Sequence, residues 1–236
     1  MDKEIAVLMA AGLGTRMRPL TDLIPKPLIK VLGVPLIETM IDSLRLRGVR
    51  EIYVVVGYRK EQFAYLENKY KNLVLVENKE YLRKNNISSI YAVKDILGRN
   101  NCFICESDIY VKNPKVFLAD LSESCYFGKK ISGYSDDWVF EMNGQWISRI
   151  QKGGTDLYNM SGVSYFQKQD VSKLKDNIID TYKRPGTERM FWDEVVNQMI
   201  PERKIGIHEI LIDDLVEVDT IKELTEIDKS YLRWMK

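Results

Sequence analysis

A run of small residues and two basic side chains near the N-terminus form the stretch of this chain best suited to chemistry. Residues 10–14, Ala-Ala-Gly-Leu-Gly, directly follow the apolar run 5–9. A backbone of small residues can turn sharply and present successive N–H groups to an anion. Thr15, Arg16 and Lys26 add a hydroxyl group and two cations, which bind phosphate oxygens. The stretch therefore predicts a strand followed by a loop that holds a nucleoside triphosphate.

The spacing in this loop differs from that of two common phosphate-binding motifs. No Gly-Lys-Ser/Thr closes it, and Met17 stands where a dinucleotide-binding loop has its third glycine. The string from Ala10 to Thr21, followed by Pro25-Lys26-Pro27, resembles the signature of nucleotidyltransferases that join a nucleoside triphosphate to a sugar phosphate or small alcohol phosphate. An ordinary strand-to-helix turn is the alternative interpretation.

Acidic side chains near the ends of two later apolar runs are candidates for a metal site. Asp108 follows the run 102–105, and Glu217 and Asp219 lie near the end of the run 215–218. Ligands of open α/β sheets bind beyond the carboxyl ends of the strands, where these side chains would meet the loop. Because Mg²⁺ takes oxygen ligands, we predict that Asp108 and Asp219 hold it. The alternatives are a turn role for Asp108 and a helix N-cap role for Asp219.

Composition excludes several classes of protein. The chain has 236 residues with 35 basic and 34 acidic side chains, so it offers no general basic face for nucleic acid. It contains no membrane-spanning apolar run and no signal-peptide pattern, which predicts a cytoplasmic location without a membrane partner. The oligomeric state, monomer or dimer, stays open.

Thiol and histidine chemistry find little support in the sequence. Cys102 and Cys105 have C-x-x-C spacing, but an extended strand would point them to opposite faces, and no second Cys/His pair accompanies them. His208 is the only histidine, in a stretch that alternates like a strand. We therefore expect no catalysis by a Ser-His or Cys-His pair.

Apolar runs and helical periodicities alternate in the first half and predict a Rossmann-like, mostly parallel, doubly wound α/β sheet. The expected strands there are residues 5–9, 51–57, 73–77 and 102–105, and the expected helices are residues 36–47, 60–71 and 88–97. The second half is richer in strands and predicts a β-rich wall on the substrate side. It should contain strands at 124–131, 160–166 and 215–218, a hairpin at 138–150 with an Asn-Gly turn, and helices at 171–182, 190–199 and 221–234.

The absence of a linker or repeat in the sequence favours a single domain over residues 1–236. We expect residues 1–123 to form its nucleotide-binding half and residues 124–236 its acceptor-binding half.

Over nearly its whole length the chain also resembles the bacterial CTP:phosphocholine cytidylyltransferases. The segments that carry this resemblance are residues 55–58, 61–63, 85–91, 108, 136–139, 161–164, 191–193 and 217–219. The resemblance implies CTP and phosphocholine as substrates, with Mg²⁺ as cofactor. Residues 145–157, which include Lys152 and Gly153-Gly154, depart from the family pattern, so the wall nearest the acceptor stays open.

Each candidate residue receives an expected role from the resemblance together with its chemistry. Arg16 and Lys26 are the expected catalytic residues, with Arg16 on the β- and γ-phosphates and Lys26 between the α-phosphate and the attacking phosphate. The residues expected around the nucleotide are Leu8, Ala10, Ala11, Gly12, Gly14, Thr15, Asn86 and Ser88. A trimethylammonium group needs aromatic faces and nearby carboxylates. The residues expected to supply these are Trp138, Trp192, Tyr134, Asp193 and Glu217, with core or rim packing as the alternative for both tryptophans.

Two other functions fit the same residues. The first is the same reaction on phosphoethanolamine, 2-aminoethylphosphonate or a sugar 1-phosphate. A primary ammonium group would need hydrogen-bond acceptors in place of aromatic faces, so a pocket lined by Asp or Asn without tryptophan would favour an acceptor that carries one. The second is a non-catalytic nucleotide-binding module, which would release no pyrophosphate.

Overall fold

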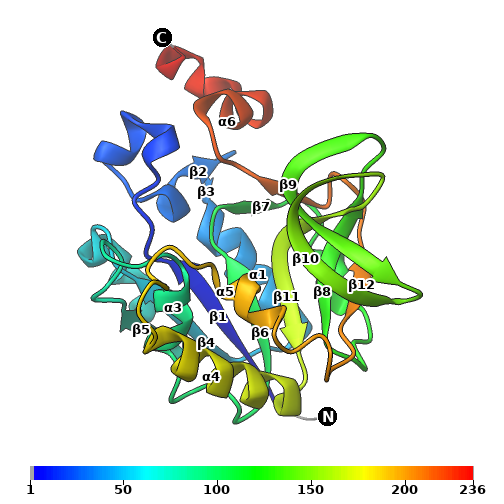
Figure 1. Ribbon diagram of the computed structural model, residues 1–236. Coiled ribbons are helices and arrows are strands. Elements are labelled where there is room, and N and C mark those ends of the chain that lie inside the picture. The colour runs from blue at the N-terminus through cyan, green and yellow to red at the C-terminus, as the bar shows by residue number, and fades with distance from the viewer. Residues whose placement is uncertain (1–2, 236) are drawn as a thin grey trace.

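A nine-stranded mixed sheet forms the centre of the computed structural model, which describes residues 3–235 (Figure 1). The strand order is β5-β4-β1-β6-β11-β8-β12-β10-β9. Its strands are β1 (Glu4–Ala10), β4 (Glu51–Val56), β5 (Leu73–Glu77), β6 (Asn101–Glu106), β8 (Cys125–Lys130), β9 (Tyr134–Asn143), β10 (Trp146–Thr155), β11 (Tyr158–Phe166) and β12 (Gly206–Glu209). Strands therefore lie at every place where the sequence predicts one in this sheet.

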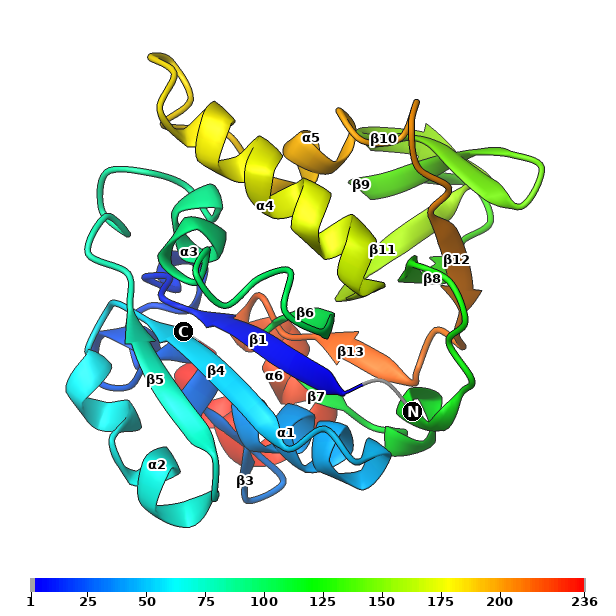
Figure 2. The same ribbon diagram turned by 90° about the horizontal axis from the view of Figure 1, so that it is seen from below.

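The first four strands in this order are parallel and are covered by helices on both faces. Alternate side chains of β1 enter two different cores: Ala6 and Leu8 pack with α1 (Leu36–Arg47), whereas Ile5 and Val7 pack with α3 and α4. The helices of the second face are α3 (Ile87–Ala92) and α4 (Lys168–Tyr182). Figure 2 shows α3 and α4 on one side of the sheet and α1 on the other. The predicted α/β class is thus confirmed.

The remaining five strands form a small barrel. Strand β11 runs antiparallel to β6, and the sheet continues from β11 through β8, β12 and β10 to β9. Strand β9 then pairs back onto β11, which closes the ring. Only the β12–β8 pair of this part is parallel, so the sheet as a whole is mixed, although β5, β4, β1 and β6 are parallel. The barrel is the β-rich wall that the second half of the sequence predicts.

Two short antiparallel ribbons lie outside the main sheet. One joins β2 (Lys30–Val31) to β3 (Val34–Pro35), and the other joins β7 (Ile109–Val111) to β13 (Leu215–Glu217). In the second ribbon Glu217 lies opposite Ile109. This pairing carries the end of the chain to the carboxyl end of β6.

Several helices are shorter than the sequence predicts. Residues 60–71 form a 3₁₀ turn followed by α2 (Tyr65–Lys69), and residues 190–199 keep only α5 (Trp192–Val196) as an α-helix. The closing helix splits into α6 (Ile221–Ile227) and a 3₁₀ segment, because Asp228 is extended and its side chain accepts from the N–H of Ser230. Within residues 3–235 no helix is long and apolar enough to span a membrane.

Candidate active site

The loop after β1 turns sharply and encloses a cavity of about 240 Å³. Gly14 has a φ of 61°, and a Cβ there would lie 3.0 Å from side-chain atoms of Lys26 and of Thr21. The Thr21 hydroxyl donates to the Gly14 carbonyl at 2.8 Å. Glycine is therefore required by both conformation and close packing. The residues that line this cavity are Met9, Ala10, Gly12, Gly14, Thr15, Arg16, Lys26, Pro27, Asp108 and Asp219.

Lys26 lies at the floor of this cavity between two carboxylates. Its Nζ is 2.6 Å from Asp108 Oδ2 and 2.6 Å from Asp219 Oδ1, and its side chain is only 9% exposed. Burial alone would lower the pKa of Lys26, but the charges and hydrogen bonds of Asp108 and Asp219 outweigh that effect and raise it. Arg16 Nη1 lies 2.6 Å from the second oxygen of Asp219. Three segments of the chain therefore converge on one charged centre.

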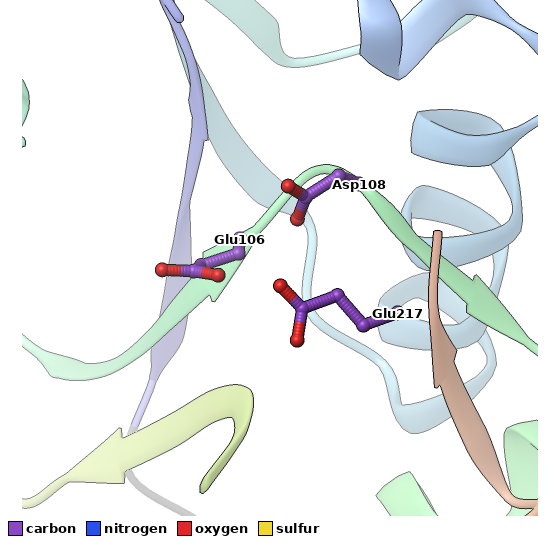
Figure 3. A group of neighbouring side chains, drawn as sticks. All are labelled: Glu106, Asp108 and Glu217. Carbon is purple, nitrogen blue, oxygen red and sulfur yellow. The ribbon is translucent and has the colours of Figure 1, made fainter. Parts of the chain in front are cut away.

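Two further carboxylates lie beside Asp108. Oxygens of Glu106, Asp108 and Glu217 lie within 4.8 Å of one another. Figure 3 shows these side chains reaching the same space from the β6–β7 segment and from β13. Burial, together with the charge of Asp108, raises the pKa of Glu106 well above its ordinary value and that of Glu217 to about 8. Asp108 Oδ1 is buried and has no hydrogen-bond partner among the described residues.

This cluster differs from the metal pair expected from the sequence, which stays a prediction. Asp219 is paired with Arg16 and Lys26, whereas Glu106 and Glu217 share the space around Asp108. Glu106 is a residue that sequence reasoning missed. The signal was its place two residues before Asp108 at the end of a buried strand.

A larger cavity of about 510 Å³ adjoins the loop and extends between the parallel strands and the barrel. It shares Met9, Gly12, Arg16, Asp108 and Asp219 with the smaller cavity. Its other lining residues are Ala11, Asn78, Tyr81, Lys84, Asn85, Asn86, Ser88, Ser89, Glu106, Asp137, Trp138, Lys152, Met160, Gly162, Phe191, Asp193 and Glu217. One continuous site therefore connects the phosphate loop with the barrel wall.

The predicted nucleotide residues lie along these two cavities, with one exception. Ala11, Gly12, Asn86 and Ser88 line the larger cavity, and Ala10, Gly14 and Thr15 line the smaller one. Leu8 lines neither cavity, because its side chain points from β1 into the core shared with α1. The side chain of Leu8 is thus outside the site, and the expected approach of its backbone to the nucleoside stays a prediction.

The predicted acceptor residues separate into two groups. Trp138, Asp193 and Glu217 line the larger cavity, and Trp138 packs edge-to-face on Phe191 with ring centroids 5.3 Å apart. The Asp193 carboxylate accepts from the Tyr126 hydroxyl at 2.9 Å, and burial raises its pKa to about 7.

Trp192 and Tyr134, by contrast, do not border the cavity. Trp192 is 3% exposed and packs against Tyr126 and Phe166, because it lies on the inner face of α5. Tyr134 is 73% exposed at the start of β9. The structure thus places Trp192 in the core, and Phe191, its neighbour, lines the cavity instead.

A family model described as nucleotidyl transferase matches residues 5–125. A 2-aminoethylphosphonate cytidylyltransferase of Lancefieldella rimae is 50% identical over 232 residues, which cover 98% of this chain and 94% of the relative. The chain belongs to the nucleotidyl transferase family. The family that the loop after β1 resembles is therefore confirmed.

More distant members of the nucleotidyl transferase family share the whole architecture. A choline-phosphate cytidylyltransferase of Streptococcus pneumoniae is 34% identical over 95% of this chain and 96% of its own length. The solved CTP:phosphocholine cytidylyltransferase of that organism superimposes with a TM-score of 0.89 at 31% identity, over 97% of this chain and 99% of the other. Both cavities therefore lie in a fold that is common to the family.

Proposed function

We propose that this chain transfers the cytidylyl group of CTP to 2-aminoethylphosphonate and releases pyrophosphate. The convergence of Lys26, Asp108 and Asp219 beneath the phosphate loop is the observation that supports nucleotidyl transfer. The relative that is 50% identical over almost the whole chain acts on 2-aminoethylphosphonate, and this supports the acceptor.

The lining of the acceptor end supports a primary ammonium group. Such a group offers three N–H donors and binds best among carboxylates, whereas a trimethylammonium group depends on aromatic faces. Asp137 and Asp193 line the cavity together with Trp138, apart from the cluster around Asp108. Of the three aromatic residues expected there from the sequence, only Trp138 lines the cavity, and Phe191 lines it in place of Trp192.

Phosphocholine is the second candidate acceptor. The edge-to-face pair of Trp138 and Phe191 favours it, because this pair presents aromatic surface to the cavity. The relatives at 34% and 31% identity are choline-phosphate cytidylyltransferases, which is consistent with this candidate.

In the proposed reaction a phosphonate oxygen attacks the α-phosphorus of CTP, and the bond from that phosphorus to the β-phosphate oxygen breaks. Lys26 neutralises charge on the α-phosphate and on the attacking phosphonate, and Arg16 holds the leaving pyrophosphate. The loop amides around Gly12 and Gly14 bind phosphate oxygens. The phosphonate is already ionised, so the reaction needs no general base. His208 packs against Phe127 and lines neither cavity, which is consistent with that mechanism.

The residues around Asp108 fit the Mg²⁺ ion on which we propose this reaction depends. Glu106 and Glu217 add carboxylate oxygens, which Mg²⁺ prefers, beside Asp108, and the buried Asp108 Oδ1, unlike the Oδ2 that pairs with Lys26, has no partner among the described residues. Glu106, Asp108 and Glu217 would hold the ion, and Asp219 borders the same space. When bound, Mg²⁺ supplies positive charge that orients and neutralises phosphate oxygens.

Pyrophosphate release from a substrate panel tests this function. The purified protein is incubated with each of the four nucleoside triphosphates and with 2-aminoethylphosphonate, phosphoethanolamine, phosphocholine or glucose 1-phosphate. We expect CTP with 2-aminoethylphosphonate to be fastest, with the product identified by mass. A faster reaction with phosphocholine would establish the second candidate. Nucleotide binding without pyrophosphate release from any pair would instead indicate a non-catalytic binding module.

A further inference from the structure

A basic side chain from the barrel wall faces the indole of Trp138. Lys152 Nζ lies 5.8 Å from the centroid of that ring, within the range of a cation–π contact. The two residues are paired across β9 and β10, and both line the larger cavity. Phe191 meets the same indole edge-to-face. The one indole that borders the cavity is therefore already in contact with an ammonium group of the chain itself.

Two glycines directly follow Lys152 at an irregularity of the β9–β10 pairing. The β9–β10 register shifts directly after Lys152, and Gly153 there has a φ of 74°. A Cβ on Gly153 would lie 2.9 Å from the Tyr134 hydroxyl, and one on Gly154 would lie 2.5 Å from Leu157 Cδ1. The positive φ at Gly153 favours glycine at the bulge, and a side chain at Gly154 would require Leu157 to shift. Lys152 and these glycines lie in residues 145–157, the segment in which the sequence departs from the family pattern.

Lys152 also differs from the other basic residues of the larger cavity. Arg16 is paired with Asp219, and Lys84 donates to the Tyr182 carbonyl and lies over that ring. Lys152 forms no ion pair with any residue of the described chain. Its positive charge is therefore available to the Trp138 indole and to a ligand in the larger cavity.

We propose that Lys152 selects the acceptor by excluding quaternary ammonium groups from Trp138. A trimethylammonium group would have to share the indole with a like charge and displace the lysine side chain. A primary ammonium loses nothing, because it binds at the carboxylates instead of the ring. The lysine thus acts by rejecting the competing acceptor, which is a recognised route to specificity. This inference rests on the proposed function.

Acceptor competition in a lysine variant tests the inference. The ratio of kcat/KM for phosphocholine to that for 2-aminoethylphosphonate is measured in the wild type and in Lys152→Met. We expect this ratio to rise about tenfold in the variant, the size of one freed cation–π contact, with KM for CTP unchanged. Lys152→Arg should keep the wild-type ratio, because a guanidinium group covers the indole equally well.

A second lysine–tryptophan pair supplies the matched control. Lys204 Nζ lies 5.6 Å from the ring centroid of Trp146, on the same barrel, and neither residue lines the larger cavity. Lys204→Met should leave the acceptor ratio unchanged.

The possible results separate the inference from the proposed function. A wild type that prefers 2-aminoethylphosphonate, with an unchanged ratio in Lys152→Met, overturns the role of Lys152 alone. An equal loss of kcat/KM for both acceptors also overturns it, because Lys152 would then bind the phosphoryl group that they share. A wild type that prefers phosphocholine or glucose 1-phosphate overturns the proposed function, and with it the exclusion, before any variant is made.

Discussion

The backbone N–H of Val218 donates a 3.0 Å hydrogen bond to the carbonyl of Asp108. This bond continues the β7–β13 ribbon and fixes the level at which the two acidic segments meet. Glu217 and Asp219 flank Val218, and Glu217 reaches the carboxylate cluster while Asp219 reaches Lys26. A backbone contact thus sets the geometry of the charged centre, and the predictions below depend on that geometry.

Removing Lys26 should abolish most turnover. Lys26→Ala should lower kcat by about 10²- to 10³-fold, the usual effect of losing one charged donor at the reacting phosphate. Steady-state pyrophosphate release measures this loss, and circular dichroism checks that the variant is folded. Lys30→Ala is the control, because Lys30 is exposed and lies outside both cavities. A Lys26 variant with near-wild-type kcat would remove this residue from the mechanism.

Replacing Glu106 with glutamine should raise Tm in the absence of Mg²⁺ and reduce the stabilisation that added Mg²⁺ provides. Without metal, Glu106→Gln should raise Tm, because one of three crowded carboxyl groups no longer has to stay neutral or repel its neighbours. Added Mg²⁺ should then raise the Tm of the variant less than it raises the Tm of the wild type, because the variant has lost a ligand of the ion. Thermal unfolding across a MgCl₂ series measures both effects.

Asp176→Asn is the matched control for this series, since Asp176 is exposed on α4. An identical Mg²⁺ response in the wild type and in Glu106→Gln would show that Glu106 holds no metal.

The two tryptophans should respond differently to truncation. Trp192→Ala should destabilise the fold by about 3–5 kcal/mol, because the ring is buried among apolar side chains. Trp138→Ala should instead change KM for the acceptor more than KM for CTP, because Trp138 lines the acceptor end of the cavity. Urea unfolding and steady-state kinetics on both variants provide the comparison. Similar stability losses in the two would contradict this assignment.

Asp193 should make stability depend on pH. Burial raises its pKa from 3.8 to about 7 in the folded chain, so the folded state binds the proton more tightly than the unfolded state does. The neutral Asp193 carboxyl group therefore contributes its full stabilisation below the pKa of the unfolded state, and this stabilisation is lost as pH rises through the pKa of the folded state. Asp193→Asn has no such loss, so it should gain stability relative to the wild type between about pH 5 and about pH 8. Urea unfolding of both proteins at about pH 5 and about pH 8 measures this gain. If the carboxyl group were already ionised at the lower pH, the difference in stability between variant and wild type would be the same at both pH values.

Sequence reasoning succeeded where one residue type has one physical use. Gly14 is needed for a positive φ beside Lys26, and that need is visible in the spacing of the loop alone. Asp108 follows a strand that is buried along its length, so its place at the sheet edge could be expected. In both cases the local pattern and the final geometry agree.

It failed where the direction of a side chain depends on distant packing. Trp192 and Phe191 are adjacent and both aromatic, and only the docking of α5 on Tyr126 decides which of them enters the core. The position of Lys152 depends on a bulge whose register is set by β9. Neither the docking of α5 nor the register of β9 and β10 produces a periodic pattern of residues in the sequence.

The charged floor of the site draws on opposite ends of the polypeptide, with Arg16 and Lys26 near the start and Asp219 near the finish. During synthesis the phosphate loop therefore emerges long before its acidic counterpart. A nascent chain or a proteolytic fragment that ends before residue 215 would retain the glycine loop, Lys26 and Asp108 but lack Glu217 and Asp219. Such a product would lack the carboxylate that pairs with Arg16 and Lys26 and one member of the cluster around Asp108, so the charged centre is complete only once residue 219 has been made.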